Sequence, residues 1–214
     1  MSIEELKLYH SSASPNSRRV RILLAEKGLK VPLVPVDLGQ GEQHSDAYRA
    51  INPRLVVPTL VLEDGTAIGE VPAIMRYLDE VFPAQPLLGT TPREKAIIQM
   101  WERRVELDGF AAVMEGVRNK IARLQGRAIA GPHDYLQIPA LVGRSIQRVE
   151  NFLADLDARL KESPFVAGAS YSAADITAMV TVDFAKALEV APTAEQRAIK
   201  RWYGVVSSRL SATA

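Results

Sequence analysis

A serine-rich segment near the N-terminus places hydroxyl groups where they can meet a bound anion. Residues 10–17 read HSSASPNS, after an alternating strand pattern and before a helical one. The first turn of a helix presents free N–H groups and a partial positive charge, which attract anions. Ser14 is therefore a candidate for contacting such an anion, and Ser11 and Ser12 are alternatives. The simpler possibility is that Ser14 and Ser17 only cap the helix.

Two further backbone features converge in residues 52–74, NPRLVVPTLVLEDGTAIGEVPAI. A proline removes a donor from a sheet, so Val57–Pro58 should begin a strand, and its peptide bond is predicted to be cis. Unpaired backbone groups at such a strand entry can pair with an extended peptide. Glu70 and Val71 open the next helix, whose N-terminus can hold a carboxylate. The alternative for Glu70 is an acid that only complements the helix dipole.

Composition excludes several classes of function. The chain has 214 residues, 47% of them apolar and 24% charged, which is ordinary for a globular protein with a real core. Its net charge of +1 gives no electrostatic reason to expect nucleic acid as a partner. The absence of cysteine excludes disulfides, thiol nucleophiles and dithiol redox chemistry. We expect no signal peptide, no membrane-spanning segment and no metal site, and therefore a cytoplasmic protein.

The first 83 residues predict a small α/β domain. The pattern alternates between strands and helices and ends in a hairpin with an Asp-Gly turn, followed by a helix. Prolines in the second strand place it at a sheet edge. The predicted elements are a strand at 6–9, a helix at 17–27, a strand at 31–38, an irregular helix within 39–50, strands at 59–62 and 66–68, and a helix from 70 to 82.

Residues 84–89 read as a linker, and residues 90–214 predict an all-helical domain. Thr91 to Glu94 form a capping box with proline at the first helical position. The helix behind it should reach about Gly126, with a bend near Gly109 or Gly116. The remaining predictions are a loop at 127–138, a long helix at 139–162, an apolar and central helix capped by Ser172 and Asp175, and a last helix from about 193 to 209.

The order of these motifs resembles the glutathione S-transferase family, in its serine-type theta, phi and zeta classes. The matching features are the proline-entered strand, the Asp-Gly hairpin, the Glu-x-x-Ala-Ile helix start, the Ser-x-x-Asp box and the Trp202–Tyr203 pair. The resemblance runs from Leu6 to about Ser211. It implies a thioredoxin-like N-terminal domain, with a mixed four-stranded sheet and three helices, followed by an all-α domain.

The resemblance also implies roles for individual residues. In the family, the backbone around the Val-Pro bond pairs with the cysteinyl unit of glutathione, and a serine donates a hydrogen bond to its sulfur. The residues at the matching positions are Ser14 for the sulfur, Val56, Val57 and Pro58 for the cysteinyl unit, Glu70 and Val71 for the γ-glutamyl end, Gln43 and His44 for the glycyl carboxylate, and Arg103 for the partner subunit's glutathione. His44 as an exposed loop histidine and Arg103 on a solvated helix face are the alternatives.

Three positions depart from the family's pattern. Val71 stands where Ser or Thr is usual, and it offers only its backbone N–H to the γ-glutamyl carboxylate. Losing a hydrogen bond to a charged group costs about 1.5–3 kcal/mol. Leu55 and Val56 replace a glycine and a polar residue before Val57–Pro58. These departures predict weaker glutathione binding, or binding through other side chains.

Three functions remain open on this sequence. The first is a homodimeric transferase that uses glutathione as co-substrate and adds its thiolate to a small apolar electrophile. The second is a non-catalytic binding or scaffold protein on the same fold, which Val71, Leu55 and Val56 favour. The third is a glutathione-dependent isomerase or dehalogenase.

Overall fold

The computed structural model describes residues 3–214, which form two compact units. One unit extends to Gln85 and includes residues 130–133 and 213–214, and the other comprises residues 86–129 and 134–212. Within residues 3–214, no helix has both the length and the apolar character needed to cross a membrane.

The first unit is built on a mixed sheet of four strands in the order β2-β1-β3-β4. Leu8 of β1 pairs with Leu33 in parallel and with Leu60 in antiparallel fashion. The prediction that the proline-rich second strand lies at an edge is confirmed. The strands are β1 (Lys7–His10), β2 (Leu33–Pro35), β3 (Thr59–Val61) and β4 (Ala67–Ile68).

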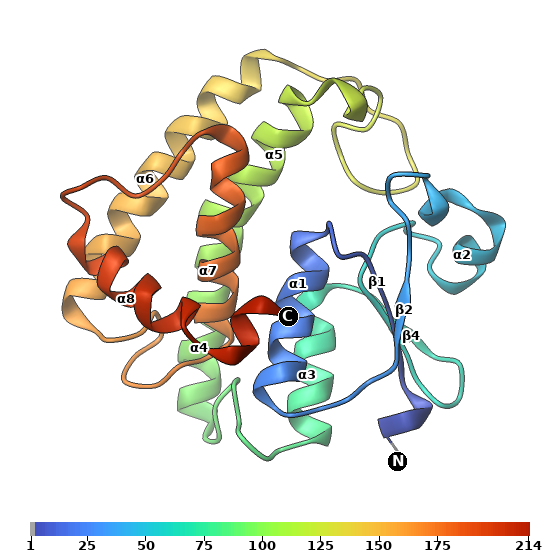
Figure 1. Cartoon of the computed structure of the whole chain (residues 1–214), viewed down its shortest axis with the longest axis horizontal. Coiled ribbons are helices and arrows are strands. Elements are labelled where there is room, and N and C mark those ends of the chain that lie inside the picture. Colours follow the sequence, from blue (N-terminus) through green and yellow to red (C-terminus); the bar gives the residue numbers. More distant parts are fainter. Residues whose placement is uncertain (1–2) are drawn as a thin grey trace. The chain divides into compact units, whose positions relative to one another are not determined.

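Helices cover both faces of this sheet. Helices α1 (Pro15–Glu26) and α3 (Val71–Val81) lie on one face and contact each other, and the short α2 (Asp46–Ile51) lies on the other (Figure 1). Alternation along β1 explains the two layers, because successive side chains point to opposite faces. Leu8 is fully buried, whereas Tyr9 meets the ring of Tyr48 from α2 edge-on, with centroids 6.1 Å apart.

A buried ion pair joins α1 to α3. The Nζ of Lys27 lies 2.7 Å from Oδ1 of Asp79, and both side chains are buried. The same ammonium donates to the carbonyls of Ala84 and Gln85, at 3.0 and 3.1 Å. All three ammonium protons therefore have acceptors, which is the condition under which a buried charge is tolerated.

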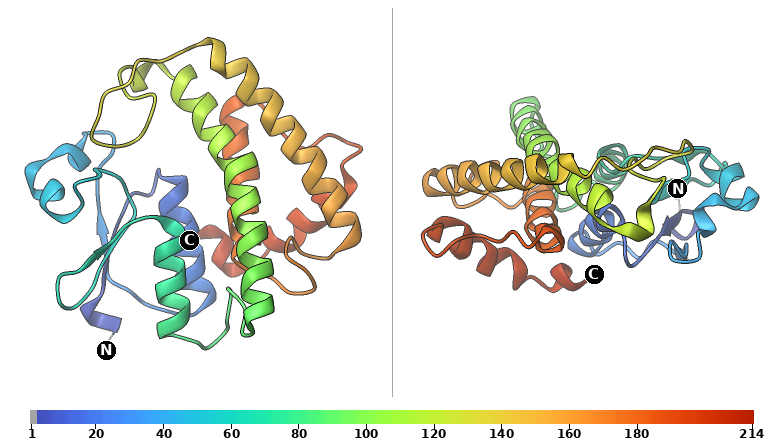
Figure 2. Two further views of the ribbon diagram at one scale, coloured as in Figure 1. Left: turned by 180° about the vertical axis from the view of Figure 1, so that it is seen from behind. Right: turned by 90° about the horizontal axis from the view of Figure 1, so that it is seen from above.

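The second unit is helical. Its helices are α4 (Pro92–Arg104), α5 (Ala111–Lys120), α6 (Ala140–Glu162), α7 (Ala173–Ala185) and α8 (Arg197–Ser207). Helices α4 and α5 form one continuous rod through a π-helical segment, Val105–Phe110 (Figure 2). The predicted bend near Gly109 falls in this segment.

The rod ends at Lys120, about two turns before the predicted end near Gly126. The reason lies in the returning loop, whose Gln137 Nε2 donates to the carbonyls of Arg118 and Ile121 at 2.6 and 2.8 Å. Asn119 Oδ1 accepts from the backbone N–H of Ile138 at 2.7 Å. These side-chain and loop contacts satisfy the helix end, so the helix stops there.

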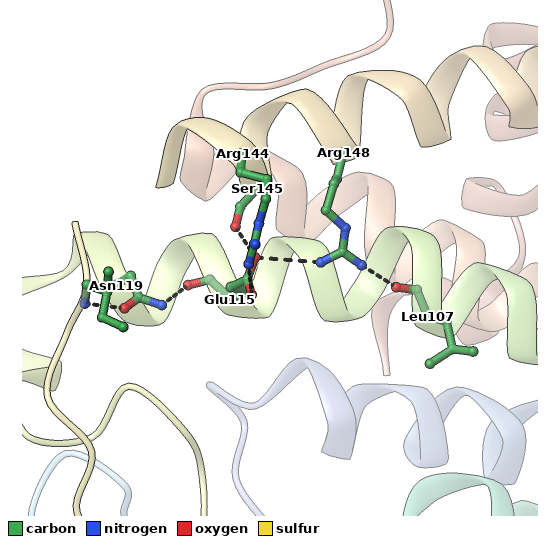
Figure 3. A network of polar contacts seen from close by, with 7 residues as sticks. Leu107, Glu115, Asn119, Arg144, Ser145 and Arg148 are labelled. Carbon is green, nitrogen blue, oxygen red and sulfur yellow. Dashed lines mark hydrogen bonds and ion pairs between the residues drawn. The ribbon is translucent and has the colours of Figure 1, made fainter. Parts of the chain in front are cut away.

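Polar contacts fasten α5 to α6 (Figure 3). The carboxylate of Glu115 accepts hydrogen bonds from the guanidinium of Arg144 at 3.0 Å and from the hydroxyl of Ser145 at 2.8 Å. The guanidinium of Arg148 lies 3.6 Å from the same carboxylate. Arg148 also donates to the carbonyl of Leu107 at 2.9 Å, within the π-helical segment. A π turn displaces carbonyls from their usual helical donors, and Arg148 supplies a replacement.

The last two helices are capped by buried acids. Asp175 of α7 accepts from the N–H groups of Val166 and Ser172, the hydroxyl of Ser172 and the indole of Trp202. Burial raises the pKa of Asp175 to about 6, although these hydrogen bonds oppose the rise. Asp157 of α6 accepts from the first N–H groups of α8, at Ala198 and Ile199. This distant cap explains why α8 begins at Arg197 and not near 193.

Candidate functional site

The serine-rich loop leads directly into α1, with Ser14 as the N-cap. Its Oγ accepts from the N–H of Ser17 at 3.2 Å, and Pro15 occupies the first helical position. The helix therefore begins two residues earlier than predicted. A hydroxyl that accepts one hydrogen bond still carries a proton to donate. Capping and contact with a bound anion are thus compatible roles for Ser14.

The loop around Ser14 is closely tied together. Ser17 Oγ accepts from the N–H of Ser11 at 3.2 Å, and the carbonyl of Ser11 accepts from the N–H of Ser14 at 3.2 Å. Ser11 and Ser14 are 6% and 7% exposed, whereas Ser12 is exposed to solvent. The geometry keeps Ser11 and Ser14 as the candidates for a fixed donor.

A cation supports this loop from α1. Arg21 donates to the carbonyl of Ser11 at 3.1 Å and lies 3.3 Å from Nδ1 of His10. Burial, and then the charge of Arg21, lowers the pKa of His10 below its usual value. The positive charge of Arg21 and the first turn of α1 both favour an anion near the loop.

The strand entry at Pro58 has the predicted geometry. The Val57–Pro58 peptide bond is cis, and β3 begins at the next residue. Leu55 adopts φ of 55°, in the left-handed region where glycine is usual. The family's glycine at this position thus has a conformational reason, and Leu55 takes the same conformation with its side chain buried.

Glu70 and Val71 stand at the start of α3, as its N-cap and its first helical residue. Glu70 has φ of 62° and ψ of 124°, its side chain is exposed, and it makes no capping hydrogen bond. Non-glycine residues in such conformations cluster at ligand-binding sites. Val71 is only 4% exposed, and its N–H, as the first in the helix, has no acceptor within α3.

Gln43 and His44 lie in a short 3-10 turn, Glu42–His44, on the segment before α2. The Oε1 of Gln43 is buried and has no hydrogen-bond partner within residues 3–214. His44 is half-buried, and this exposure is compatible both with contact to a ligand and with a loop histidine that faces solvent. The unpartnered atom of Gln43 is an acceptor, so contact with a carboxylate would have to come from the Nε2 of the same amide.

Arg103 lies in the other unit, on α4. Its guanidinium is 60% exposed and pairs with Glu106 one turn later, at 2.7 Å. The exposure and this local pair are compatible both with a solvated helix face and with contact to a second subunit. Across the described residues, 3–214, no three His, Asp or Glu side chains gather as a metal site would require.

Sequence reasoning missed the buried polar side chains that hold the cis-proline loop. Tyr48, Asn52 and Thr59 surround the carbonyl of Val56. The available signal was a pair of polar residues, Asn52 and Thr59, on both sides of the apolar Val56–Pro58 segment.

Comparison with known proteins places both units in one family. The model of the glutathione S-transferase N-terminal domain matches residues 8–86, and that of the C-terminal domain matches residues 139–204. Glutathione S-transferase 2 of Saccharomyces cerevisiae is 31% identical over 226 aligned residues, covering 97% of this chain and 88% of the relative.

Solved structures and shorter matches agree with this result. A glutathione S-transferase domain-containing protein of Marinobacter aquaeolei superimposes with a TM-score of 0.86 at 35% identity, over 96% of this chain and 98% of that one. A maleylacetoacetate isomerase of Pseudomonas aeruginosa is 42% identical over 93 residues, which are 42% of this chain and 44% of that protein.

Proposed function

This chain belongs to the glutathione S-transferase family, and we propose that it transfers the thiolate of glutathione to small apolar electrophiles. One observation carries the proposal. A single unit contains the cis Val57–Pro58 strand entry, the left-handed Glu70 before α3, and a buried hydroxyl at the N-cap of α1. The backbone groups suit an extended peptide, and the hydroxyl suits an anionic sulfur.

The tripeptide would be held along this unit from end to end. The backbone of Val57 pairs with the cysteinyl unit, and Pro58 and Val56 shape that strand entry. The Glu70 carboxylate accepts from the γ-glutamyl ammonium, and the Val71 N–H donates to the γ-glutamyl carboxylate. Gln43 and His44 serve the glycyl carboxylate.

Ser14 would act on the sulfur. The thiolate is the nucleophile, so the glutathione thiol must lose its proton to solvent before it attacks. The Ser14 hydroxyl donates a hydrogen bond to the thiolate and does not take the proton. The N-terminus of α1 adds a favourable field for the same charge. The sulfur then forms a bond to the electrophilic carbon, and the leaving group departs with the electron pair.

A homodimer joined through α3 and α4 completes the proposal, with Arg103 reaching the partner subunit's glutathione. The support is family membership and the exposed apolar side chains Val81 and Met100 on these helices, 37% and 41% exposed. A stable dimer should bury at least about 1,000 Å². Light scattering at micromolar concentration should give twice the monomer mass, and a monomer would remove the role of Arg103.

Two measurements together separate an enzyme from a scaffold. We expect retention on immobilised glutathione and turnover of a chlorodinitrobenzene-type electrophile, with one glutathione consumed per product. Retention without turnover of a panel of electrophiles would favour the non-catalytic binding protein. Failure of retention and turnover together would refute the proposal.

A second candidate is a glutathione-dependent isomerase, favoured by the similarity to the maleylacetoacetate isomerase of Pseudomonas aeruginosa. There the thiolate would add to a double bond, allow rotation and leave again, so that glutathione is regenerated. Maleylacetoacetate converted without loss of free thiol would support this reaction. A loss of thiol in proportion to product would support conjugation.

A further inference from the structure

The carbonyl of Val56 lies at the centre of a buried hydrogen-bond cluster. It accepts from the hydroxyl of Tyr48 at 2.7 Å and from Nδ2 of Asn52 at 3.1 Å. The hydroxyl of Thr59 lies 3.3 Å from this carbonyl and 3.0 Å from Oη of Tyr48, and it accepts from Asn52 at 2.8 Å. We call Tyr48, Asn52 and Thr59 the Val56 clamp.

The clamp is buried, and its side chains form hydrogen bonds with one another as well as with the Val56 carbonyl. Thr59 is 0% exposed, Tyr48 4% and Asn52 6%. Oδ1 of Asn52 accepts from the N–H of Arg54 at 2.9 Å, so the amide is satisfied at both ends. Burial raises the pKa of Tyr48 above its usual value, which keeps its hydroxyl a donor. A satisfied polar network in a low-dielectric interior fixes a single arrangement.

Fixing the Val56 carbonyl also fixes the N–H of Val57. Both belong to one planar trans peptide unit, in which the C=O and N–H point in opposite directions. The carbonyl faces the clamp, so the Val57 N–H faces away from it. No hydrogen bond to this N–H is formed within residues 3–214.

The Val57 side chain is held by the same tyrosine. Val57, Val36 and Tyr48 form a buried apolar cluster, against which Tyr9 and Leu38 pack. The ring of Tyr48 therefore supports the Val57 side chain, while its hydroxyl holds the preceding carbonyl. Rotation of the Val56–Val57 peptide would break both contacts.

We propose that Tyr48, Asn52 and Thr59 are positioning residues for glutathione, which hold the Val56–Val57 peptide plane so that the Val57 N–H meets the cysteinyl unit. The inference rests on the proposed function, because it needs glutathione at this strand entry. The clamp side chains are buried and contact the Val56 carbonyl, so they should affect the binding of glutathione and not the chemical step.

The test measures glutathione affinity and turnover for Tyr48→Phe and Thr59→Val, which remove hydroxyls with little change in size. Each should raise Kd by calorimetry, and KM for glutathione, about three- to tenfold. The kcat at saturating glutathione should stay within about twofold of wild type. The double variant Tyr48→Phe/Thr59→Val should raise Kd by less than the product of the two single fold increases, because both hydroxyls act on the same carbonyl. Thr59→Ser, which keeps the hydroxyl, should bind glutathione with an affinity close to that of wild type.

Tyr203→Phe and Thr177→Val are matched controls in the helical unit, where these hydroxyls donate to Asp183 and Glu102. They should change thermal stability without changing KM. Wild type that fails to bind glutathione refutes the proposed function itself. Two outcomes overturn the inference alone, provided that the wild-type protein binds glutathione. The first is an unchanged Kd in Thr59→Val. The second is a loss of affinity in Thr59→Ser as large as that in Thr59→Val. A fall in kcat with unchanged KM also overturns it.

Discussion

Ser14 has two roles that a set of variants can separate, because its hydroxyl oxygen accepts the capping hydrogen bond whereas its proton would be donated to the thiolate. Ser14→Ala removes both. Loss of an N-cap costs about 1 kcal/mol, which for a protein of this size lowers Tm by about 2–4 °C. Loss of one charge-assisted hydrogen bond should raise the pKa of the bound thiol by about one to two units, at 1.36 kcal/mol per unit. Turnover near neutral pH should fall about tenfold or more and recover at high pH.

Two further variants isolate these effects. Glycine at an N-cap costs only a few tenths of a kcal/mol, so Ser14→Gly should lose turnover with almost no loss of Tm. Thr91→Ala removes a capping hydrogen bond of the same 3.2 Å length and should lower Tm with an unchanged pH profile. Turnover is measured against pH, with thiolate absorbance as the direct readout. Full neutral activity in both Ser14 variants, with loss in Ser11→Ala, would show that Ser11 contacts the sulfur.

Three other outcomes follow from the structure. Lys27→Met removes the ammonium that pairs with the buried Asp79 carboxylate and should destabilise the protein by about 3–5 kcal/mol in urea unfolding. Arg76→Ala, in an exposed pair, should have little effect. The carboxyl of Asp175 has a pKa of about 6 in the folded protein and about 3.9 in the unfolded chain, so it binds its proton more tightly when the protein is folded. Its contribution to the free energy of unfolding therefore falls as pH rises from about 4 to about 6. The unfolding free energy of wild type minus that of Asp175→Asn should therefore shrink over this range, by about 3 kcal/mol at most; a growing difference would contradict the raised pKa. Val71→Thr should lower KM for glutathione about tenfold, and an unchanged KM would show that the side chain at this position does not contact the tripeptide.

The N-terminal fold was readable from local rules. Proline at a strand entry, the Asp-Gly hairpin and an edge strand rich in prolines each constrain the backbone without help from distant residues. The predicted cis bond at Val57–Pro58 is confirmed, and it too followed from a local rule. Apolar periodicity likewise gave α6 to within one residue. The apolar helix predicted to run to Leu188 ends as an α-helix three residues earlier, at Ala185, and continues as a 3-10 turn.

Helix ends set by distant side chains were not readable. The rod stops at Lys120 because Gln137 returns to its carbonyls, and α8 starts at Arg197 because Asp157 caps it from α6. The left-handed backbone of Leu55 was not predictable from its residue type either, because leucine does not favour positive φ. These features depend on tertiary contacts and have no local signature.

A crystal structure with glutathione bound would show whether the tripeptide lies along the cis-proline strand entry with its sulfur at Ser14. The cysteinyl unit should lie antiparallel to Val57, in hydrogen-bond contact with its backbone, and the sulfur should lie within about 3.5 Å of the Ser14 hydroxyl. The γ-glutamyl end should reach Glu70 and the N–H of Val71. Glutathione bound away from the cis-proline strand entry, or a sulfur held without contact to Ser14, would contradict the account.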